Sequence, residues 1–450
     1  MKSLLRRSSA DSPAEAAQRR SPDGIDGLSV LTVYLILLCA IPSSLTITAL
    51  GSAGRPASLW ALAATLWWGW YQLQRLQPSG AGPQYVRRAI FVLLGLAAIS
   101  YAVAMLRGLP SDEISPADNG LLRLVAWAGI LLIANDGLST PDEFRTLLRR
   151  IALVGGLLAT LGILQFLTNS ALIDWLSIPG MSSNLPNLAG VDARGGFVRA
   201  SATASHPLEY AVVLSIAFPI SIVLAMEDST RSRLVRWFPV AAIAVASVLS
   251  VSRSALIGIL VGLFVVATAW PGRVRATFGV LGVALVIVIA ILVPGLVATT
   301  RSLFTGLPDD SSAISRTNSY GVALDLLGRF PLVGKGFGTL LPRYYIFDNQ
   351  YVQLTIELGL LGLVSLLAVL GAAVASAASA RRKAFYSLDR HLSQALVAAL
   401  SAAGLQMAFF DGLSFPIAAG MLFLTIGLCG AAKRLLSNDP PAVFQPIATR

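Results

Sequence analysis

Residues 316–362 read RTNSYGVALDLLGRFPLVGKGFGTLLPRYYIFDNQYVQLTIELGLLG and lie between two strongly apolar parts of the chain. Charged residues are frequent in this stretch, and Pro331 with the glycines of GKGFG predicts a tight turn where the backbone can approach a ligand. A long loop with this much charge is usually functional. Its last part, DNQYVQLTIELGLLG, leads into an apolar helix with the polar residues first. We interpret the segment as one wall of an active site that faces away from the cytoplasm.

The composition limits the class of protein. The chain has 450 residues, of which 55% are hydrophobic and 13% are charged, so it is too apolar for a set of soluble domains. The apolar runs are long and unbroken, which excludes a β-barrel and predicts an all-α polytopic membrane protein. Cys39 and Cys429 both lie in apolar runs and indicate neither a disulfide nor a metal site.

Runs of roughly 17 to 25 apolar residues predict about twelve transmembrane helices. They lie near 28–50, 57–74, 89–107, 120–135, 148–168, 207–226, 237–251, 254–270, 276–294, 350–378, 392–410 and 413–432. This division predicts a disordered cytoplasmic tail at 1–27, a single transmembrane domain at 28–435 and a second cytoplasmic tail at 436–450. Long extracytoplasmic loops are expected at about 169–206 and 295–350.

The net charge of +11 is explained by topology. With the N-terminus inside, each short basic connection falls on the cytoplasmic side, as the positive-inside rule requires. These connections carry Arg75, Arg87, Arg88, Arg145, Arg149, Arg150, Arg231, Arg233, Arg236, Arg273, Arg275, Arg381, Arg382, Lys383, Arg390, Lys433 and Arg434. The charge therefore does not indicate nucleic-acid binding.

The run Trp237–Trp270 decides this count, because it is interrupted only by Ser250, Ser252, Arg253 and Ser254. As one straight helix it would be about 50 Å long, against a hydrocarbon core of about 30 Å. One long span would also place the basic cluster at 381–383 outside. We therefore expect two short spans, with Arg253 in an external hairpin.

Three arginines are predicted on the outer side, against the topological bias: Arg199, Arg253 and Arg316. An arginine at the membrane boundary is costly to desolvate unless it meets an anion, and its planar fork suits phosphate oxygens. Together the three predict a pyrophosphate-binding site. The alternative is that each one extends to lipid headgroups or pairs with a neighbouring carboxylate.

Two residues are candidate general bases. Asp348 precedes Asn349 at the start of the tenth span, where a partly shielded carboxylate near arginines can accept a proton from an attacking hydroxyl. The alternative is an ordinary helix N-cap. His206, before Pro207, is the other candidate, with a simple interface residue as its alternative. Asp411 in FFDGLSFP is a boundary acid placed to pair with one of the arginines, but a turn residue before Gly412 is the favoured interpretation.

The sequence contains no Walker-type phosphate loop, Rossmann fingerprint, HExxH motif or cysteine cluster. The glycines of GKGFG are predicted outside and follow no strand, so they are not interpreted as a nucleotide loop. No cofactor and no metal is expected.

The pattern resembles the O-antigen ligase and polymerase superfamily of bacterial membrane glycosyltransferases. The resemblance rests on the hairpin Ser252–Ala255, on Arg316 followed by GRFPLVGKGFGT, and on DNQY leading into IELGLLGL. It covers roughly Phe197 to Leu363. Relatives usually have histidine where this chain has Asp348, which leaves the base open between Asp348 and His206.

The resemblance implies a GT-C-like fold in the bacterial cytoplasmic membrane and an active site on its outer side. It implies transfer of a glycan from an undecaprenyl-pyrophosphate carrier to a hydroxyl of a glycan, lipid or protein acceptor, without metal. Arg199, Arg253 and Arg316 would bind the pyrophosphate, with Asn349, Lys335 and Arg343 as further donor-binding residues. Membrane lipid is an expected partner, and a chain-length regulator or flippase is a candidate.

The DNQYVQLTIELGLLG helix start favours a polymerase over a ligase. Two other classes remain open. A secondary transporter of a small anion would place ionisable residues near the midplane of broken helices, whereas here they gather at the outer boundary. A non-catalytic polysaccharide-assembly protein is the other alternative, because the usual histidine is missing.

Overall fold

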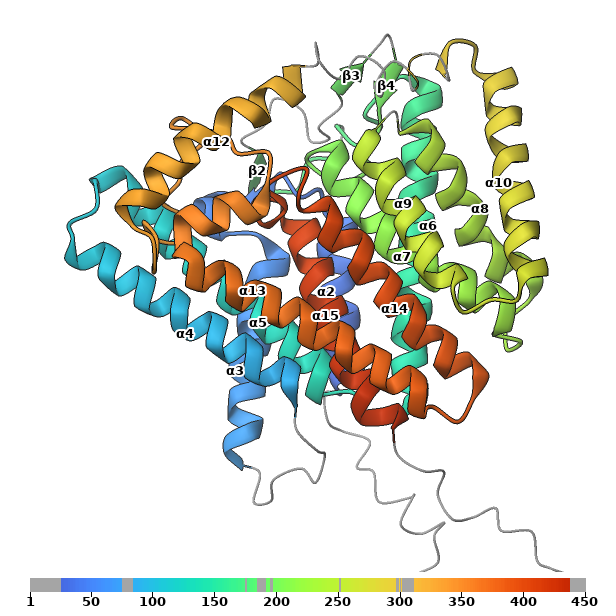
Figure 1. The fold of residues 1–450 in the computed structure, drawn as a ribbon, viewed down its shortest axis with the longest axis horizontal. Coiled ribbons are helices and arrows are strands. Elements are labelled where there is room, and N and C mark those ends of the chain that lie inside the picture. Colours follow the sequence, from blue (N-terminus) through green and yellow to red (C-terminus); the bar gives the residue numbers. More distant parts are fainter. Residues whose placement is uncertain are drawn as a thin grey trace, which may run out of the picture.

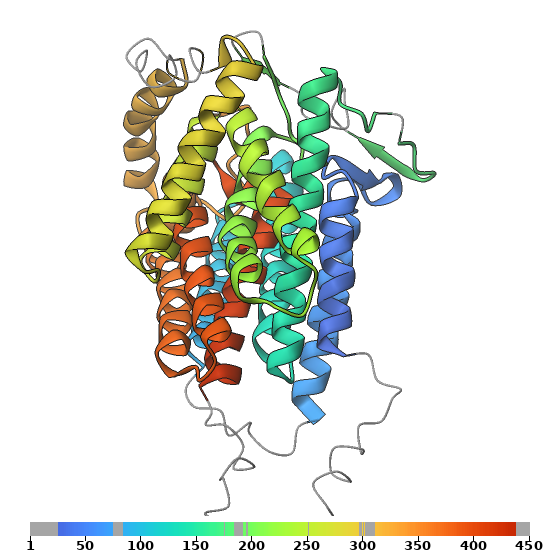
Figure 2. The ribbon, with the colours of Figure 1, turned by 90° about the vertical axis from the view of Figure 1, so that its right-hand side faces the viewer.

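The computed structural model describes residues 26–74, 84–174, 176–183, 192–194, 197–250, 252–296, 299, 301 and 311–437. The two predicted tails lie almost wholly outside these ranges. The described chain forms a bundle of helices that run between two ends of the molecule (Figures 1 and 2). The only sheets in this part of the chain are two short antiparallel pairs of strands.

A helix lies in each of the twelve expected ranges: α2 (Gly27–Ala40), α3 (Pro56–Gln74), α4 (Tyr85–Leu106), α5 (Ser111–Asp136), α6 (Pro141–Thr168), α7 (Pro207–Glu227), α8 (Arg233–Leu249), α9 (Arg253–Ala267), α10 (Gly272–Leu292), α13 (Gln350–Lys383), α14 (Ser387–Gln406) and α15 (Pro416–Leu436). Among the described helices, seven are long and apolar enough to cross a membrane, namely α4, α5, α6, α7, α10, α13 and α15. The all-α multi-pass class is confirmed, whereas the number of twelve spans stays a prediction.

Helices α7 and α15 form the centre of the bundle. Nearly every residue of their apolar stretches is buried, while α10 lies at the edge and exposes its side chains (Figure 1). Helix α15 packs against α5 and α13, and α7 packs against α14 and α9. Small residues allow the close approach: a Cβ at Gly427 of α15 would lie 2.4 Å from the carbonyl oxygen of Leu131 in α5.

The first helix is shorter than expected. The apolar run predicts 28–50, but α2 ends at Ala40 and Ile41 is extended, as a residue before proline prefers. The chain continues as β1 (Leu45–Ile47) and a 3₁₀ helix (Thr48–Ala53). Strand β1 pairs antiparallel with β2 (Met181–Ser183) from the predicted loop 169–206, and β3 (Asp192–Arg194) pairs with β4 (Phe197–Arg199) in the same loop.

The run Trp237–Trp270 is broken as predicted. Helix α8 ends at Leu249 and α9 begins at Arg253, and the Ser252 hydroxyl caps α9 by accepting a hydrogen bond from the Ala255 N–H. The hydroxyls of Ser252 and Ser254 lie 3.1 Å apart. Arg253 therefore lies at a turn between two helices, as the sequence indicates.

The predicted outer loop 295–350 contains a helix that the sequence analysis does not anticipate. Helix α12 (Ser311–Arg329) lies across the start of α13 (Figure 1). It is held there by an apolar cluster of Ala323, Leu340, Phe347 and Ile356. Its composition is only weakly apolar, so no membrane span is apparent, and the helix depends on contact with α13.

The glycine-rich turn is bonded to a break in α13. The N–H of Lys335 donates to the Ile356 carbonyl and the N–H of Gly336 to the Glu357 carbonyl, both at 2.9 Å. Gly359 has a φ of +70°, and a Cβ there would lie 2.2 Å from the Leu332 carbonyl oxygen. The turn and the start of α13 thus hold each other through backbone contacts that only glycine permits.

Replacing Gly359 with alanine is expected to destabilise the protein by about 1–3 kcal/mol. An alanine is strained at this positive φ, and its Cβ would clash with the Leu332 carbonyl oxygen. Gly371 lies on the same helix and a Cβ there would meet nothing within 4 Å, so Gly371→Ala is the matched control. Thermal unfolding of the purified proteins in one detergent compares them. Equal unfolding temperatures for the two variants would show that the turn does not depend on Gly359.

Candidate functional site

The hairpin Met407–Phe415, which joins α14 to α15, is the point where the candidate residues meet. The N–H of Gln350 donates to the carbonyls of Met407 at 2.8 Å and Phe410 at 3.1 Å. The Gln350 side-chain oxygen accepts the Leu413 N–H at 2.7 Å. These three bonds fasten the start of α13, and with it Asp348 and Asn349, to the hairpin.

Arg253 begins the helix that packs against the same end of α14. The Gln406 amide donates to the Ser254 carbonyl at 2.9 Å and to the Ser215 hydroxyl of α7 at 3.0 Å. Gly258 makes room for this amide, because a Cβ there would lie 2.2 Å from its nitrogen. Gln406, the last residue of α14, therefore contacts the start of α9, and the next residue, Met407, begins the hairpin that holds α13.

His206 lies on the α7 side of the hairpin. It is the N-cap of α7, and its Nδ1 accepts the Leu208 N–H at 3.1 Å. Its ring lies 5.6 Å from that of Phe415. Because Nδ1 uses its lone pair for the cap, the neutral ring carries its proton on Nε2. The role of His206 as a general base stays a prediction.

At the start of α13, the residue that caps the helix is not the residue that carries the carboxylate. Asn349, and not Asp348, is the N-cap: its side-chain oxygen accepts the N–H groups of Tyr351 at 3.0 Å and Val352 at 3.3 Å. Asp348 is half-buried directly before the cap. The helix-capping alternative therefore applies to Asn349, and the role of Asp348 as a base stays a prediction.

Asp411 is a further candidate that the sequence analysis assigned to a turn. Burial, with a smaller contribution from the charge of Asp348, raises the pKa of its carboxyl to about 6, against an opposing hydrogen bond from Ser414. The two carboxylates thus lie close enough to influence each other. An Asp–Gly pair is a common turn signal, so nothing in the sequence alone marks Asp411 as functional.

Glu209 connects three outer segments beside this hairpin. Its carboxylate accepts hydrogen bonds from the hydroxyl of Ser43 at 3.0 Å, the N–H and hydroxyl of Ser205 at 2.9 Å each, and the N–H of Ile417 at 2.6 Å. It is fully buried. Four hydrogen bonds to one carboxylate fix the segment that carries His206 against the start of α15.

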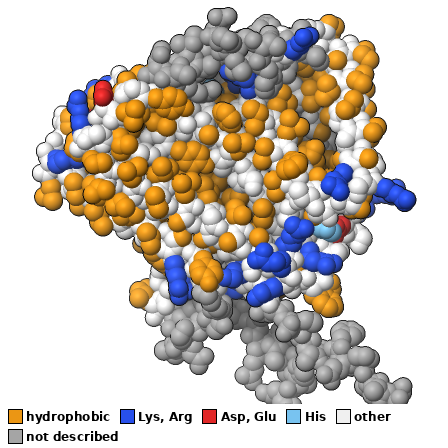
Figure 3. Space-filling model, in the orientation of Figure 1, with side chains coloured by type: hydrophobic (Ala, Val, Ile, Leu, Met, Phe, Trp, Pro, Cys, Tyr) orange, Lys and Arg blue, Asp and Glu red, His pale blue; other side chains and the backbone are white. Residues whose placement is uncertain are grey.

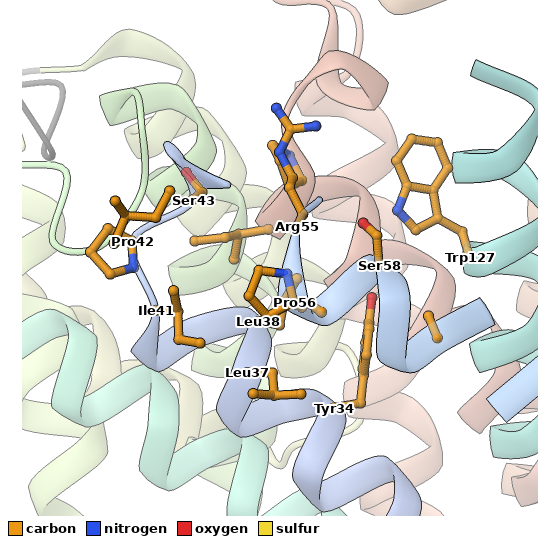
Figure 4. Close-up of a pocket in the computed structure, with 15 residues that line it drawn as sticks. Tyr34, Leu37, Leu38, Ile41, Pro42, Ser43, Arg55, Pro56, Ser58 and Trp127 are labelled. Atoms are coloured by element: carbon orange, nitrogen blue, oxygen red, sulfur yellow. The ribbon is translucent and has the colours of Figure 1, made fainter. Parts of the chain in front are cut away.

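Arg55 is a basic residue that the sequence analysis missed. It lines a pocket between α2, α3, α5 and α15, and Figure 4 shows its guanidinium pointing away from Leu37 and Leu38. Burial lowers the pKa of Arg55, and the nearby Glu209 carboxylate opposes this effect. Its Nε is buried and has no hydrogen-bond partner among the described residues. The signal in the sequence that could have identified Arg55 was an arginine in an apolar setting.

A second pair of charged residues, Glu357 and Arg123, supports the glycine turn. The Glu357 carboxylate accepts the backbone N–H groups of Leu340 and Gly338, with the charge of Arg123 from α5 nearby. Arg123 in turn feels the charge of Arg55. The two arginines and the carboxylates of Glu209 and Glu357 therefore form a buried charged layer beneath the outer loops. Such groups are costly inside a membrane protein unless they are paired.

Lys335 and Arg343 contact acidic residues at the start of α5. The Lys335 amino group lies 2.6 Å from Glu113 Oε1 and 4.7 Å from the centre of the Tyr344 ring. Arg343 forms an ion pair with Asp112 and stacks on Tyr344. Their positive charges are balanced within the protein, which favours a structural part in holding the outer loop. Their binding of a donor glycan stays a prediction.

The remaining two arginines are not brought together with Arg253 by the contacts described. Arg199 ends β4 and is buried, beside a segment that Gln165 of α6 holds through the N–H groups of Ser201 and Ala202. Arg316 lies in the first half of α12, and its side chain is outside the described residues. A site shared by all three therefore stays a prediction. No group of three or more His, Cys, Asp or Glu residues arranged to hold a metal ion occurs among the described residues.

A family model described as O-antigen ligase matches residues 238–367, somewhat less than a third of the chain. This range begins in α8 and ends within α13, so it contains Arg253, Arg316, the glycine turn and Asp348. This match supports membership of the O-antigen ligase and polymerase superfamily. The resemblance drawn from the sequence is thereby confirmed. No curated protein matches the chain.

The match to the O-antigen ligase model supports a glycosyltransferase-like membrane enzyme of polysaccharide biosynthesis. The matched region supplies α9 and the start of α13. Asp411, His206 and Arg55 lie outside it, on helices and turns that pack against the matched region. The candidate site is thus built partly from the family region and partly from the rest of the bundle.

Proposed function

We propose that this protein transfers a glycan from an undecaprenyl-pyrophosphate carrier to an acceptor hydroxyl at the outer face of the bacterial cytoplasmic membrane. The observation that carries the proposal is the fastening of Asp348 and the start of α13 to the hairpin that bears Asp411, beside the start of α9 with Arg253. A pair of carboxylates next to an arginine is what this reaction needs, a base and a cation for the leaving group.

In the proposed reaction the acceptor oxygen attacks the anomeric carbon of the donor sugar. A new glycosidic C–O bond forms, the bond from that carbon to the pyrophosphate breaks, and the lipid pyrophosphate leaves with the electron pair. Asp348, coupled to Asp411, takes the acceptor proton. Arg253 stabilises the charge that develops on the leaving pyrophosphate. The His206 Nε2–H is suited to donate a further hydrogen bond, and Arg55 adds positive charge behind it.

A groove beside Asp348 supports a polyprenyl donor. A cavity of about 430 Å³ lies between α12 and α13 and is lined almost only by apolar atoms, with Tyr320, Leu324, Leu327 and Val352 among its walls. It reaches Tyr351, three residues after Asp348. An apolar chain that entered from the bilayer would therefore bring its pyrophosphate end towards the hairpin.

Within this proposal a polymerase is favoured over a ligase, on the helix start DNQYVQLTIELGLLG. The proposed partners are the lipid-linked donor, a second lipid-linked glycan as acceptor, and membrane lipid, with a chain-length regulator or flippase as an associated protein. The test is incubation of the purified protein with a lipid-linked oligosaccharide. Longer chains on the carrier support a polymerase, and glycan moved to an added acceptor supports a ligase. Unchanged substrate with correctly folded protein would contradict both.

The pH dependence of turnover tests the role of Asp411. Because the pKa of Asp411 is raised to about 6, its carboxyl is largely neutral at pH 5 and largely ionised at pH 7. If the ionised pair accepts the acceptor proton, turnover should rise from pH 5 to pH 7 with a midpoint near 6. Asp411→Asn should move or remove this midpoint. A profile that is the same in the wild type and in Asp411→Asn would exclude Asp411 from the pair.

A further inference from the structure

A second cavity lies at the opposite end of the bundle, between α6, α7 and α8. Its volume is about 300 Å³. Arginines from two separate segments line it, Arg149 and Arg150 from α6 with Arg231 and Arg236 from the α7–α8 connection and the start of α8. By the positive-inside rule this is the cytoplasmic end. In Figure 3 many of the visible Lys and Arg side chains gather at the same lower end, below the apolar band.

The cavity carries an excess of positive charge. Among the described residues that line it, Asp228 is the one acidic residue, against four arginines. Burial alone would raise the pKa of Asp228, but hydrogen bonds from Arg149 and Thr230 outweigh it and lower the pKa to about 2. The Arg149 Nε lies 2.6 Å from the carboxylate, so this one acid neutralises this one arginine.

Arg236 lines the cavity and has hydrogen-bond donors that the described residues do not use. One of its terminal nitrogens donates to the Asp228 backbone carbonyl at 2.7 Å, while its Nε is buried and has no hydrogen-bond partner among the described residues. Arg231 is exposed. The guanidinium groups of Arg231 and Arg236 therefore remain available for an anion that enters the cavity, and such groups bind phosphate oxygens well.

The rest of the lining is largely apolar. Leu153, Leu224, Val235 and Pro239 contribute to it, and Leu153 is 46% exposed. The first turns of α8 also present apolar side chains outwards, with Leu234 86% exposed. A stack of Trp237 on Phe278 lies at the same level. Aromatic side chains of this kind mark the membrane–water boundary, so the cavity lies at the depth of the lipid headgroups.

The N-terminal tail of this chain does not fit the cavity as its occupant. Residues 1–25 contain five basic and three acidic residues and are therefore net positive. They would be repelled by the arginines, although α2 passes nearby, where Arg150 contacts the Thr32 hydroxyl. An anion with an attached apolar part matches both halves of the cavity.

We propose that this cavity binds an anionic phospholipid of the cytoplasmic leaflet. Its headgroup phosphate lies against Arg231 and Arg236, and one acyl chain follows Leu153 and Val235 into the bilayer. Basic pockets between transmembrane helices on the cytoplasmic side are suited to such lipids. The site lies at the other end of the bundle from the glycan-transfer site and does not depend on that proposal. A bound lipid would join α6 to α8, the helix that leads to the Arg253 turn.

The test reconstitutes the full-length protein in nanodiscs of phosphatidylcholine with or without phosphatidylglycerol. Lipid that stays bound after transfer to detergent is then counted by mass spectrometry. The wild type should retain phosphatidylglycerol. The double variant Arg231→Gln, Arg236→Gln should bind it roughly thirtyfold more weakly, since each arginine near an anionic lipid contributes about a factor of five. Arg273→Gln with Arg275→Gln, in the next cytoplasmic connection, removes the same charge outside the cavity and should leave retention unchanged.

A second variant keeps the test valid if the arginine variant folds poorly. Leu153→Trp keeps all four arginines and fills the apolar half from a partly exposed position, so it too should lose the retained lipid. Equal loss in the Arg273/Arg275 control, or full retention in Leu153→Trp, would show attraction by surface charge and overturn the site. If millimolar inorganic phosphate displaces the retained lipid in the wild type, the site selects a free anion and the lipid assignment is wrong.

Discussion

Replacing Arg253 with alanine is expected to abolish glycan assembly while the protein still accumulates normally in the membrane. Removing a cation that stabilises developing charge in a buried site usually costs about a hundredfold to a thousandfold in turnover. The fold should survive, because the cap of α9 is the Ser252 hydroxyl and the carbonyl that bonds Gln406 belongs to Ser254. Chain lengthening of a lipid-linked oligosaccharide by the purified variant is the measurement.

Two companion variants sharpen this result. Arg253→Lys keeps the charge but loses the planar fork, so it should recover only part of the turnover. Arg275→Ala removes an arginine from the cytoplasmic end and should leave turnover unchanged. Arg316→Ala is expected to be as inactive as Arg253→Ala if α12 contributes its arginine to the same pyrophosphate. Full activity in both Arg253→Ala and Arg316→Ala would remove the pyrophosphate-binding role of these arginines.

The second large effect is expected at Asp348. Asp348→Asn keeps the size of the side chain and removes its ability to accept a proton, so turnover should fall by about 10²–10⁴. Binding of the lipid-linked donor should change little, because the arginines that hold it remain. Single-turnover kinetics at saturating donor, combined with a donor-binding measurement, separates the two quantities.

The neighbouring residue provides the matched control. Asn349→Ala removes the cap of α13, which accepts the N–H groups of Tyr351 and Val352, and should cost about 0.5–2 kcal/mol of stability. It leaves the Asp348 carboxylate in place, so turnover per folded molecule at saturating donor should stay close to that of the wild type, and a weaker donor affinity in the same variant would reveal the donor-binding role expected of Asn349. If Asp348→Asn is as active as the wild type while Asp411→Asn is inactive, then Asp411 is the base.

The membrane class and most helix positions could be predicted from the sequence, because long apolar runs and basic connections follow directly from bilayer thickness and topology. The break at Arg253 was predictable for the same reason, since one helix across Trp237–Trp270 would be too long. The end of α2 at Ala40 was less visible. Residues 41–50 still contain Ile41, Leu45, Ile47 and Leu50, and Pro42 with the two serines after it is the signal that the chain leaves the helix.

The site was predictable only in part. Asp348, Asn349, Arg253 and His206 were selected by residue type and position, and the structure gathers their segments around one hairpin. Which residue caps α13 depends on side-chain direction, which spacing alone does not give. Asp411 and Arg55 were missed because their importance comes from neighbours that are distant in the chain, Asp348 for Asp411 and Glu209 for Arg55. Helix α12 was missed because its stability comes from contact with α13.

The hairpin Met407–Phe415 is made from nearly the last part of the described chain. Every other segment of the candidate site, from Arg55 to Asn349, is synthesised before it, and Glu209 gains the Ile417 N–H only when α15 is present. During co-translational insertion the earlier helices are therefore in place before the candidate site is complete. Under the proposed function, a chain that stalls before the final helix is inserted is an inert product rather than an uncontrolled transferase.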